Sequence, residues 1–141
     1  MVEIRGEGIK DFIPQRDPII MVDTLYGATD DEADTGLTIT DDNLFCSEGL
    51  FREPGLVEHI AQSASAFAGY KARAKEGPAP IGLIGEIKKF RIHFLPRSGD
   101  ELHTHIRIIS EVLGVSLLTA ETEVNGEIAA RCQMKIFIKP S

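Results

Sequence analysis

The sequence has few cysteines and no long apolar run. Its 141 residues include only Cys46 and Cys132, too few for the disulfide framework of a small secreted domain. No apolar run approaches the roughly 18 residues that a membrane-spanning helix needs. The N-terminus has no basic flank followed by an apolar stretch, so we expect no secretory signal. These absences predict a reduced, cytoplasmic protein with no membrane insertion.

Positive charge is also scarce. The chain has 15 Lys and Arg against 22 Asp and Glu, a net charge of −7. This balance argues against a nucleic-acid backbone as the main ligand. The sequence also lacks a zinc-type cysteine spacing and a phosphate-binding loop. We therefore expect no nucleic acid, no metal and no cofactor.

What is present is typical of one globular domain. Apolar residues make up 43% of the chain and charged residues 26%, values that are ordinary for a folded domain and argue against disorder. A length of 141 residues suits a single core, and no internal repeat or linker divides the chain. We expect one domain over residues 1–141.

Apolar periodicity and turn signals predict two strands, one long helix and four further strands. The first strands are expected at residues 19–29 and 30–40, after a short helical turn at 9–13. The helix is expected to begin after Pro54-Gly55 and to run to about Lys75. The rest of the chain alternates in the manner of strands. This order predicts an α+β fold with an antiparallel sheet.

The expected helix carries very little side chain. Its small residues are Ser63, Ala64, Ser65, Ala66, Ala68, Gly69 and Ala72. A sheet that curls around the helix would bring backbone close on several sides, where only small residues fit. An ordinary alanine-rich amphipathic helix is the alternative, but its polar residues should then lie on one broad stripe, which they do not.

Three segments resemble one enzyme family. "IPQRDPIIMVD" (13–23), "EHIAQ" (58–62) and "FLPRSGDEL" (94–102) resemble, in order, three motifs of the 3-hydroxyacyl-[acyl carrier protein] dehydratases of the FabZ type. The resemblance implies a hot-dog fold, in which a curved antiparallel sheet wraps around one helix. It also implies a homodimer or higher oligomer whose interface forms acyl pockets, and a substrate that is a thioester of acyl carrier protein or CoA.

The chain departs from that family in the loop before the helix. The family places a catalytic histidine there in a His-Phe-Pro-Gly segment, whereas "CSEGLFREPG" (46–55) contains no histidine. Of the family's acid/base pair, the resemblance transfers only the glutamate, onto Glu58. The chain is therefore similar to a divergent branch of the family.

Two roles are possible for Glu58, capping of the helix and acid/base catalysis. A carboxylate near a helix start is favoured by exposed N–H groups and by the helix dipole, so it could simply cap the helix. As an acid/base it would serve dehydration, which needs a base, an acid and donors for an enolate-like oxygen. The backbone N–H groups of Gly55 and Leu56 are candidates for those donors. Gln62, four residues on, shares the face of Glu58 and could orient its carboxylate.

His59 is a candidate substitute for the missing histidine. Adjacent helix residues point about 100° apart, so Glu58 and His59 of one chain cannot easily address the same atom. A packing role therefore stays open beside a catalytic one. Glu48, in the loop, is another possible stand-in.

Several residues outside the candidate acid/base site also have a possible role. His103 and His105 share a strand face, and we expect them to face solvent or a subunit contact. They could also bind a metal, but no carboxylate spacing supports this. Cys46 sits among acids that would raise its pKa, so a nucleophile is not expected. Arg16 is expected to anchor the N-terminal segment on a carboxylate. Lys88, Lys89, Arg91 and Arg97 form a basic cluster that could steer an acidic carrier protein or could simply be solvated.

Three functions remain open on the sequence. The first is a 3-hydroxyacyl-[acyl carrier protein] dehydratase-like enzyme of fatty-acid or related lipid biosynthesis. The second is a hot-dog acyl thioesterase, which needs no loop histidine. The third is a non-catalytic acyl-binding subunit that pairs with an active homologue.

Overall fold

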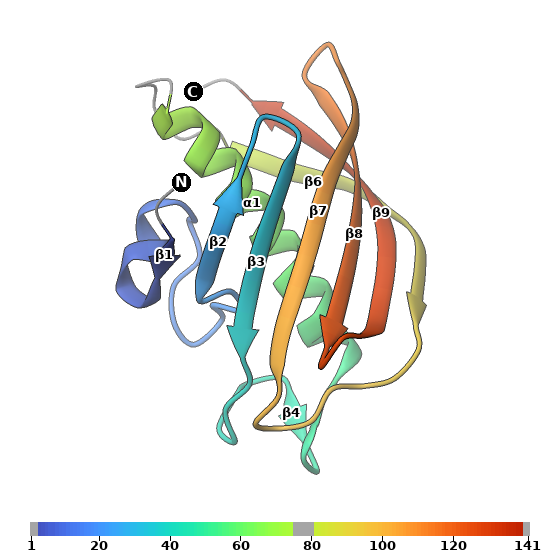
Figure 1. The fold of residues 1–141 in the computed structure, drawn as a ribbon. Helices are drawn as coiled ribbons and strands as arrows, with labels where there is room; N and C mark the ends of the chain where they lie inside the picture. The colour runs from blue at the N-terminus through green and yellow to red at the C-terminus, as the bar shows by residue number, and fades with distance from the viewer. Residues whose placement is uncertain (1–2, 75–80, 140–141) are drawn as a thin grey trace.

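The computed structural model describes residues 3–74 and 81–139. In chain order its elements are β1 (Ile4–Arg5), the 3₁₀ helix η1 (Gly6–Asp11), β2 (Thr24–Ala28), β3 (Glu32–Thr38), β4 (Cys46–Ser47), β5 (Leu50–Phe51), α1 (Glu53–Ala74), β6 (Ile81–Ile92), β7 (Glu101–Val112), β8 (Val115–Val124) and β9 (Glu127–Lys139). Figure 1 shows α1 lying behind one large sheet. The predicted order of two strands, a long helix and four strands is present in β2, β3, α1 and β6 to β9, whereas the two-residue strands β1, β4 and β5 were not predicted.

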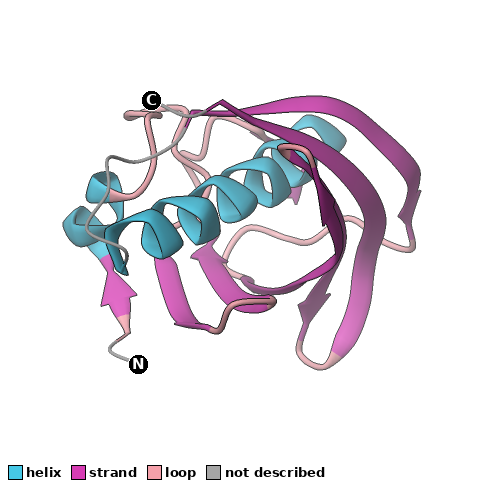
Figure 2. Cartoon of the chain, turned by 90° about the horizontal axis from the view of Figure 1, so that it is seen from above, coloured by secondary structure: helices cyan, strands magenta, loops and turns pink. Residues whose placement is uncertain are grey.

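The large sheet is antiparallel and curves around the helix. The described residues form a seven-stranded sheet in the order β1-β2-β3-β7-β8-β9-β6, and β4 and β5 form a separate hairpin. Seen from above, the strands bend around the axis of α1 (Figure 2). This is the α+β arrangement predicted from the sequence, a curved sheet around one long helix.

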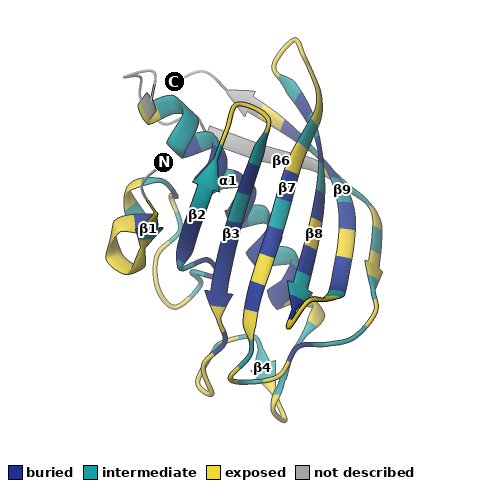
Figure 3. Cartoon of the chain, in the orientation of Figure 1, coloured by how far each residue is buried: buried dark blue, intermediate teal, exposed yellow. Residues whose placement is uncertain are grey.

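The helix is enclosed closely enough to explain its small residues. Ser63, Ala64 and Ala66 are buried, and buried positions recur along the strands that face α1 (Figure 3). A Cβ atom on Gly69 would collide with the backbone carbonyl of Phe12. The wrapped-helix interpretation therefore fits the structure better than an alanine-rich surface helix.

The start of the helix differs from the prediction. α1 begins at Glu53 and includes Pro54 and Gly55, because proline lacks an N–H that the first helical turn does not need. Gly55 is required there by packing, since a Cβ atom would lie 2.6 Å from Cζ of Phe51. Glu58 is consequently in the second turn, and capping of the helix start does not account for it. The predicted end near Lys75 lies outside the described residues.

The first strand also differs from the prediction. β2 begins only at Thr24, although a strand was expected from residue 19. The backbone of residues 19–21 is hydrogen-bonded to side chains of α1. It is therefore unable to form strand ladder bonds with those same groups.

The apolar interior forms two adjoining clusters. One surrounds the middle and C-terminal half of α1 and contains Ile60 and Phe67. The other lies at the head of the helix and contains Leu56 and Phe51, with Phe90 and Ile92 of β6 packed against it. The inner side of β6 thus forms part of the wall around the helix turn that precedes Glu58.

We predict that Gly69→Ala destabilises the fold by about 1–3 kcal/mol, because the added methyl group meets rigid backbone at Phe12. This loss should appear although Ala in a helix interior is favoured over Gly by roughly 0.5–1 kcal/mol. Urea unfolding measures it. Gly27→Ala is the matched control, since nothing lies within 4 Å of the position of its Cβ. Equal stability of the two variants would contradict the close approach.

Candidate active site

Gln62 fixes the carboxylate of Glu58. The side chain of Gln62 is fully buried, and its Nε2 donates to Oε2 of Glu58 at 2.7 Å. The same Nε2 donates to the carbonyl of Ile19 at 2.8 Å, and Oε1 accepts from the backbone N–H of Met21 at 2.6 Å. Both N–H bonds of the amide are therefore occupied, which sets the direction from which Glu58 is bound. The predicted contact between the two side chains is present.

His59 lies in the interior, not in a cleft. Its exposed fraction is 0%; Nδ1 lies 2.6 Å from the carbonyl oxygen of Met21 and Nε2 lies 2.7 Å from Oγ1 of Thr104. A carbonyl oxygen only accepts, so Nδ1 carries the proton and Nε2 of the neutral ring accepts from the threonine. Burial lowers the pKa of His59 from 6.5 to about 4. The buried position of His59, with both ring nitrogens hydrogen-bonded, favours a role inside the fold over direct contact with a substrate.

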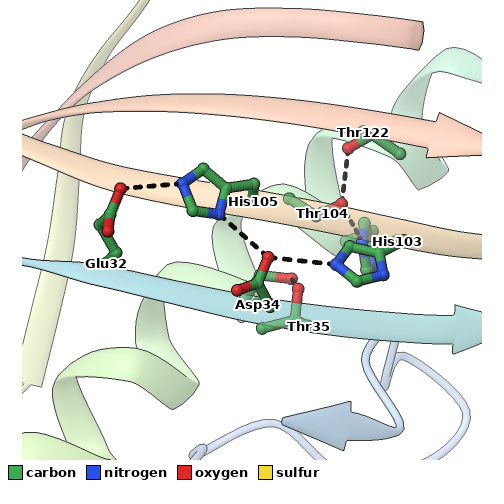
Figure 4. A network of polar contacts seen from close by, with 9 residues as sticks. Glu32, Asp34, Thr35, His103, Thr104, His105 and Thr122 are labelled. Carbon is green, nitrogen blue, oxygen red and sulfur yellow. Dashed lines mark hydrogen bonds and ion pairs between the residues drawn. The ribbon is translucent and has the colours of Figure 1, made fainter. Parts of the chain in front are cut away.

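Two threonines extend this contact across the sheet. Oγ1 of Thr104 on β7 lies 2.7 Å from Oγ1 of Thr122 on β8 (Figure 4). Because the hydroxyl of Thr104 donates to His59, it accepts from Thr122. Sequence reasoning missed this pair. The available signal was that Thr104 occupies an inward position between Leu102 and Ile106, where a polar residue needs a partner.

The predicted oxyanion donors are already engaged. The N–H groups of Gly55 and Leu56 donate to the carbonyl of Arg52 at 2.9 and 3.3 Å. They are bonded there because α1 begins three residues earlier than predicted. In this chain the prediction that these two N–H groups bind a substrate oxygen does not fit the structure.

The loop before the helix carries no substitute base. Burial, and then the charge of Asp41, raise the pKa of the Cys46 thiol, which agrees with the expectation that it is no nucleophile. Glu48 is highly exposed, and its carboxylate lies 3.7 Å from Nη2 of Arg52. Neither residue is placed as a partner for Glu58.

A histidine–carboxylate cluster lies on the outer face of the sheet (Figure 4). Oδ1 of Asp34 lies 3.1 Å from Nε2 of His103 and 2.9 Å from Nδ1 of His105, and Glu32 lies 3.2 Å from the other ring nitrogen of His105. Burial alone would raise the pKa of Asp34, but the bonds from both histidines lower it. The bond to Asp34 raises the pKa of His105. Within the described residues no group has the arrangement of a metal site.

Arg16 and the basic cluster are arranged differently from the prediction. Nη1 of Arg16 donates to the backbone carbonyls of Ile13 and Gln15 rather than to a carboxylate. Lys88 is paired with Glu86 at 3.6 Å. A shallow groove of about 290 Å³ on the outer face of β6, β8 and β9 instead combines Lys89, Arg91, Thr119, Ala120, Glu121, Arg131, Cys132 and Gln133.

An apolar cavity of about 220 Å³ lies along the C-terminal half of α1. Its walls include Ala64, Phe67, Ala68, Ile108, Leu118 and Ile136. Ala64 is six residues beyond Glu58, which places this wall about 9 Å along the helix axis from the carboxylate. In the described part of the chain no helix is long and apolar enough to span a membrane.

The comparisons with known proteins agree on family and fold. Residues 7–141 match the family described as "ApeP-like: ApeP dehydratase". The 3-hydroxyacyl-[acyl-carrier-protein] dehydratase FabZ of Shewanella woodyi is 26% identical over 136 residues, which cover 89% of this chain and 86% of that protein. The dehydratase heterocomplex ApeI:P from Xenorhabdus doucetiae contains a chain with a TM-score of 0.86 at 12% identity, covering 94% of this chain and 91% of that one. A hypothetical thioesterase from Streptococcus pneumoniae TIGR4, solved with coenzyme A, has a TM-score of 0.67 at 8% identity, covering 83% of this chain and 85% of that one. The hot-dog fold implied by the three motifs is confirmed.

We predict that His59 makes the fold less stable at acidic pH. Its pKa is 6.5 in an unfolded chain and about 4 here, so only the unfolded state binds the proton between these values. Stability from this residue is complete above pH 6.5 and falls as the pH drops toward 4. The loss between pH 7 and pH 5 should be about 2 kcal/mol.

Urea unfolding of the wild-type protein and of His59→Asn at both pH values measures this effect. The comparison cancels the contributions of other titrating groups, His105 among them. An equal pH dependence in the two proteins would show that the imidazole is not held neutral.

Proposed function

Because the chain belongs to the ApeP-like dehydratase family, we propose that it takes part in the dehydration of 3-hydroxyacyl thioesters, with Glu58 as an acid/base group. One observation carries the proposal. The carboxylate of Glu58, on the second turn of the enclosed helix, accepts a hydrogen bond from the fully buried amide of Gln62. Among the described residues only its Oε2 is hydrogen-bonded, and the side chain of Glu58 is half-buried.

The reaction needs a proton removed next to the carbonyl and a proton given to the departing hydroxyl. One carboxylate can perform both steps in turn, but a second group is usual in the dehydratases that the chain resembles. The four histidines of the chain are His59, His93, His103 and His105. His59 is buried on α1, His93 lies just beyond the end of β6, and His103 and His105 lie on β7, so none lies in the loop before the helix.

We infer that the second acid/base group comes from another subunit. Hot-dog enzymes place their acyl pockets at subunit interfaces, and the neighbour from Xenorhabdus doucetiae is itself described as a dehydratase heterocomplex. The partner proposed here is a hot-dog chain that carries the loop histidine. A homodimer of this chain would lack such a histidine in both of its sites.

The substrate is proposed to arrive on an acidic carrier protein at the basic groove. Arg91 and Arg131 are direct register partners on β6 and β9, and like charges directly opposite each other are unfavourable in an isolated sheet. Glu121 lies 3.6 Å from Arg131, while the described residues offer no ion pair to Lys89 or Arg91. The inner side of the same β6 segment packs against the head of α1. The groove and the candidate site therefore lie on opposite faces of this strand.

We predict that Glu58→Gln abolishes enoyl formation, with a loss of at least about 100-fold in kcat, the scale on which general acid/base groups act. The substrate is a 3-hydroxyacyl thioester of carrier protein or of pantetheine. Enoyl absorbance and free thiol are followed together, with the chain alone and co-expressed with a hot-dog subunit that has the loop histidine. Glu53→Gln is the control, because Glu53 is an exposed acid one turn earlier in the same helix.

The outcomes separate the candidate functions. Enoyl formation that depends on Glu58 supports the dehydratase. Thiol release without enoyl formation would replace it with a thioesterase. Silence of both signals, with retained acyl binding, would leave a non-catalytic subunit and end the proposal for Glu58.

We predict that Arg91→Glu raises the KM for a carrier-bound substrate about tenfold and leaves the KM for a pantetheine substrate unchanged, because only the carrier provides acidic surface. The effect should shrink at high salt, which screens exposed charges. Arg107→Glu, on the outer face of β7, is the matched control. A similar rise for both substrates would assign Arg91 to the acyl site instead of the carrier.

A further inference from the structure

We propose that His59 is a positioning residue: it fixes the backbone of Met21 and, through Gln62, the carboxylate of Glu58. The inference rests on the proposed function of Glu58 and assigns His59 no contact with substrate. Its basis is a continuous set of hydrogen bonds between two strands, the helix and the segment that precedes β2.

The segment of residues 19–21 is held by α1 rather than by a neighbouring strand. Gln62 binds the carbonyl of Ile19 at 2.8 Å and the N–H of Met21 at 2.6 Å. His59 binds the carbonyl of Met21 at 2.6 Å. Residues three apart are neighbours on a helix surface. The side chains of His59 and Gln62 therefore bind successive polar groups of the same backbone segment. A shift of Met21 therefore displaces the amide that also binds Glu58.

The imidazole is itself oriented from the sheet. The hydroxyl of Thr122 donates to Thr104, Thr104 donates to Nε2 of His59, and Nδ1–H donates to Met21. All three side chains in this chain of bonds are buried. Because the ring has a bond at each nitrogen, it can neither rotate nor swap its proton without leaving a buried polar group unsatisfied. The sheet thus determines where Met21 lies relative to α1.

A second polar bond between α1 and the sheet provides an internal comparison. Oγ1 of Thr35 donates to Oγ of Ser63 at 2.7 Å, and both side chains are buried. This bond has the same length as that between His59 and Thr104 and joins the same helix to the sheet. The side-chain hydrogen bonds to the backbone of residues 19–21 come from Gln62 and His59 and not from this pair. Its removal should weaken the fold without moving Glu58.

Two substitutions of His59 each keep one of its two hydrogen bonds and remove the other. Asn places a donor near the position of Nδ1 and keeps the bond to Met21, while Gln places an acceptor near the position of Nε2 and keeps the bond to Thr104. We expect His59→Gln to lower kcat by roughly 10- to 100-fold, the scale of a displacement of about 1 Å in a catalytic group. We expect His59→Asn to retain kcat within about threefold, and KM to change little in both.

Thr35→Val is the structural control and should lower stability while leaving the kcat of the folded protein unchanged. Thr104→Val is the second test if His59→Gln does not fold; it removes the outer anchor of the ring and should give an intermediate loss of kcat. Equal losses in the Asn and Gln variants, or a comparable loss in Thr35→Val, would overturn the positioning role.

A measurement independent of turnover separates this inference from the proposed function. Amide hydrogen exchange at Met21 should be at least about tenfold faster in His59→Gln than in the wild-type or His59→Asn protein, since exchange reports local opening. Nitrogen-15 shifts of His59 should show a neutral ring protonated at Nδ1 at pH 6. If the wild-type protein has no dehydratase activity, the proposed function fails, and these signals still decide whether His59 fixes Met21. Unchanged exchange in His59→Gln would overturn the inference.

Discussion

The close approach between the N-terminal segment and α1 governs the architecture around Glu58. Residues 12–21 cross the helix so closely that Gly69 has no room for a Cβ atom beneath Phe12. Backbone groups buried in such a contact need partners. The segment is not a strand there, so side chains of the helix must supply those partners. Gln62 and His59 do so, and Gln62 uses its remaining donor on Glu58.

The free-energy cost of burying the imidazole of His59 is offset because each ring nitrogen has a matching hydrogen-bond partner. A charged ring in this interior would have to lose its hydration, which is the cause of its low pKa. A neutral ring has one donor and one acceptor, and the fold presents one acceptor at Met21 and one donor at Thr104. Leucine could fill the same space, but it would leave both groups unsatisfied. Polar residues in this interior therefore specify one position of the segment where apolar packing alone would permit several.

Features that depend on local geometry could be predicted from the sequence. The spacing of Glu58 and Gln62 places both on one helix face, and the Asn125-Gly126 pair predicts a hairpin that the structure contains, with both residues at positive φ. The wrapped helix was predictable because small residues recur without a polar stripe.

Features that depend on distant parts of the chain could not be predicted in this way. Gln62 meets Met21 across 41 residues, and His105 meets Asp34 across 71, and no local pattern encodes either register. The sequence predicts a break at Pro54-Gly55, whereas proline is tolerated in a first helical turn and α1 includes both residues. The difference of three residues places Gly55 and Leu56 at a free helix end in the prediction, where their N–H groups would be unbonded donors.

The residues that bind Glu58 orient its carboxylate and do not share its acid/base chemistry. Gln62 can donate to Glu58 but cannot exchange a proton at neutral pH, and His59 is turned into the interior by bonds at both nitrogens. Among the described residues, the one side chain that is hydrogen-bonded to Glu58 therefore orients the carboxylate and does not titrate. An orienting scaffold of this precision is of use only where a substrate or a facing side chain is held in equally fixed geometry. In the part of the chain that the structure describes, β6 is an edge strand of the sheet, and its Phe90 and Ile92 pack near the head of α1.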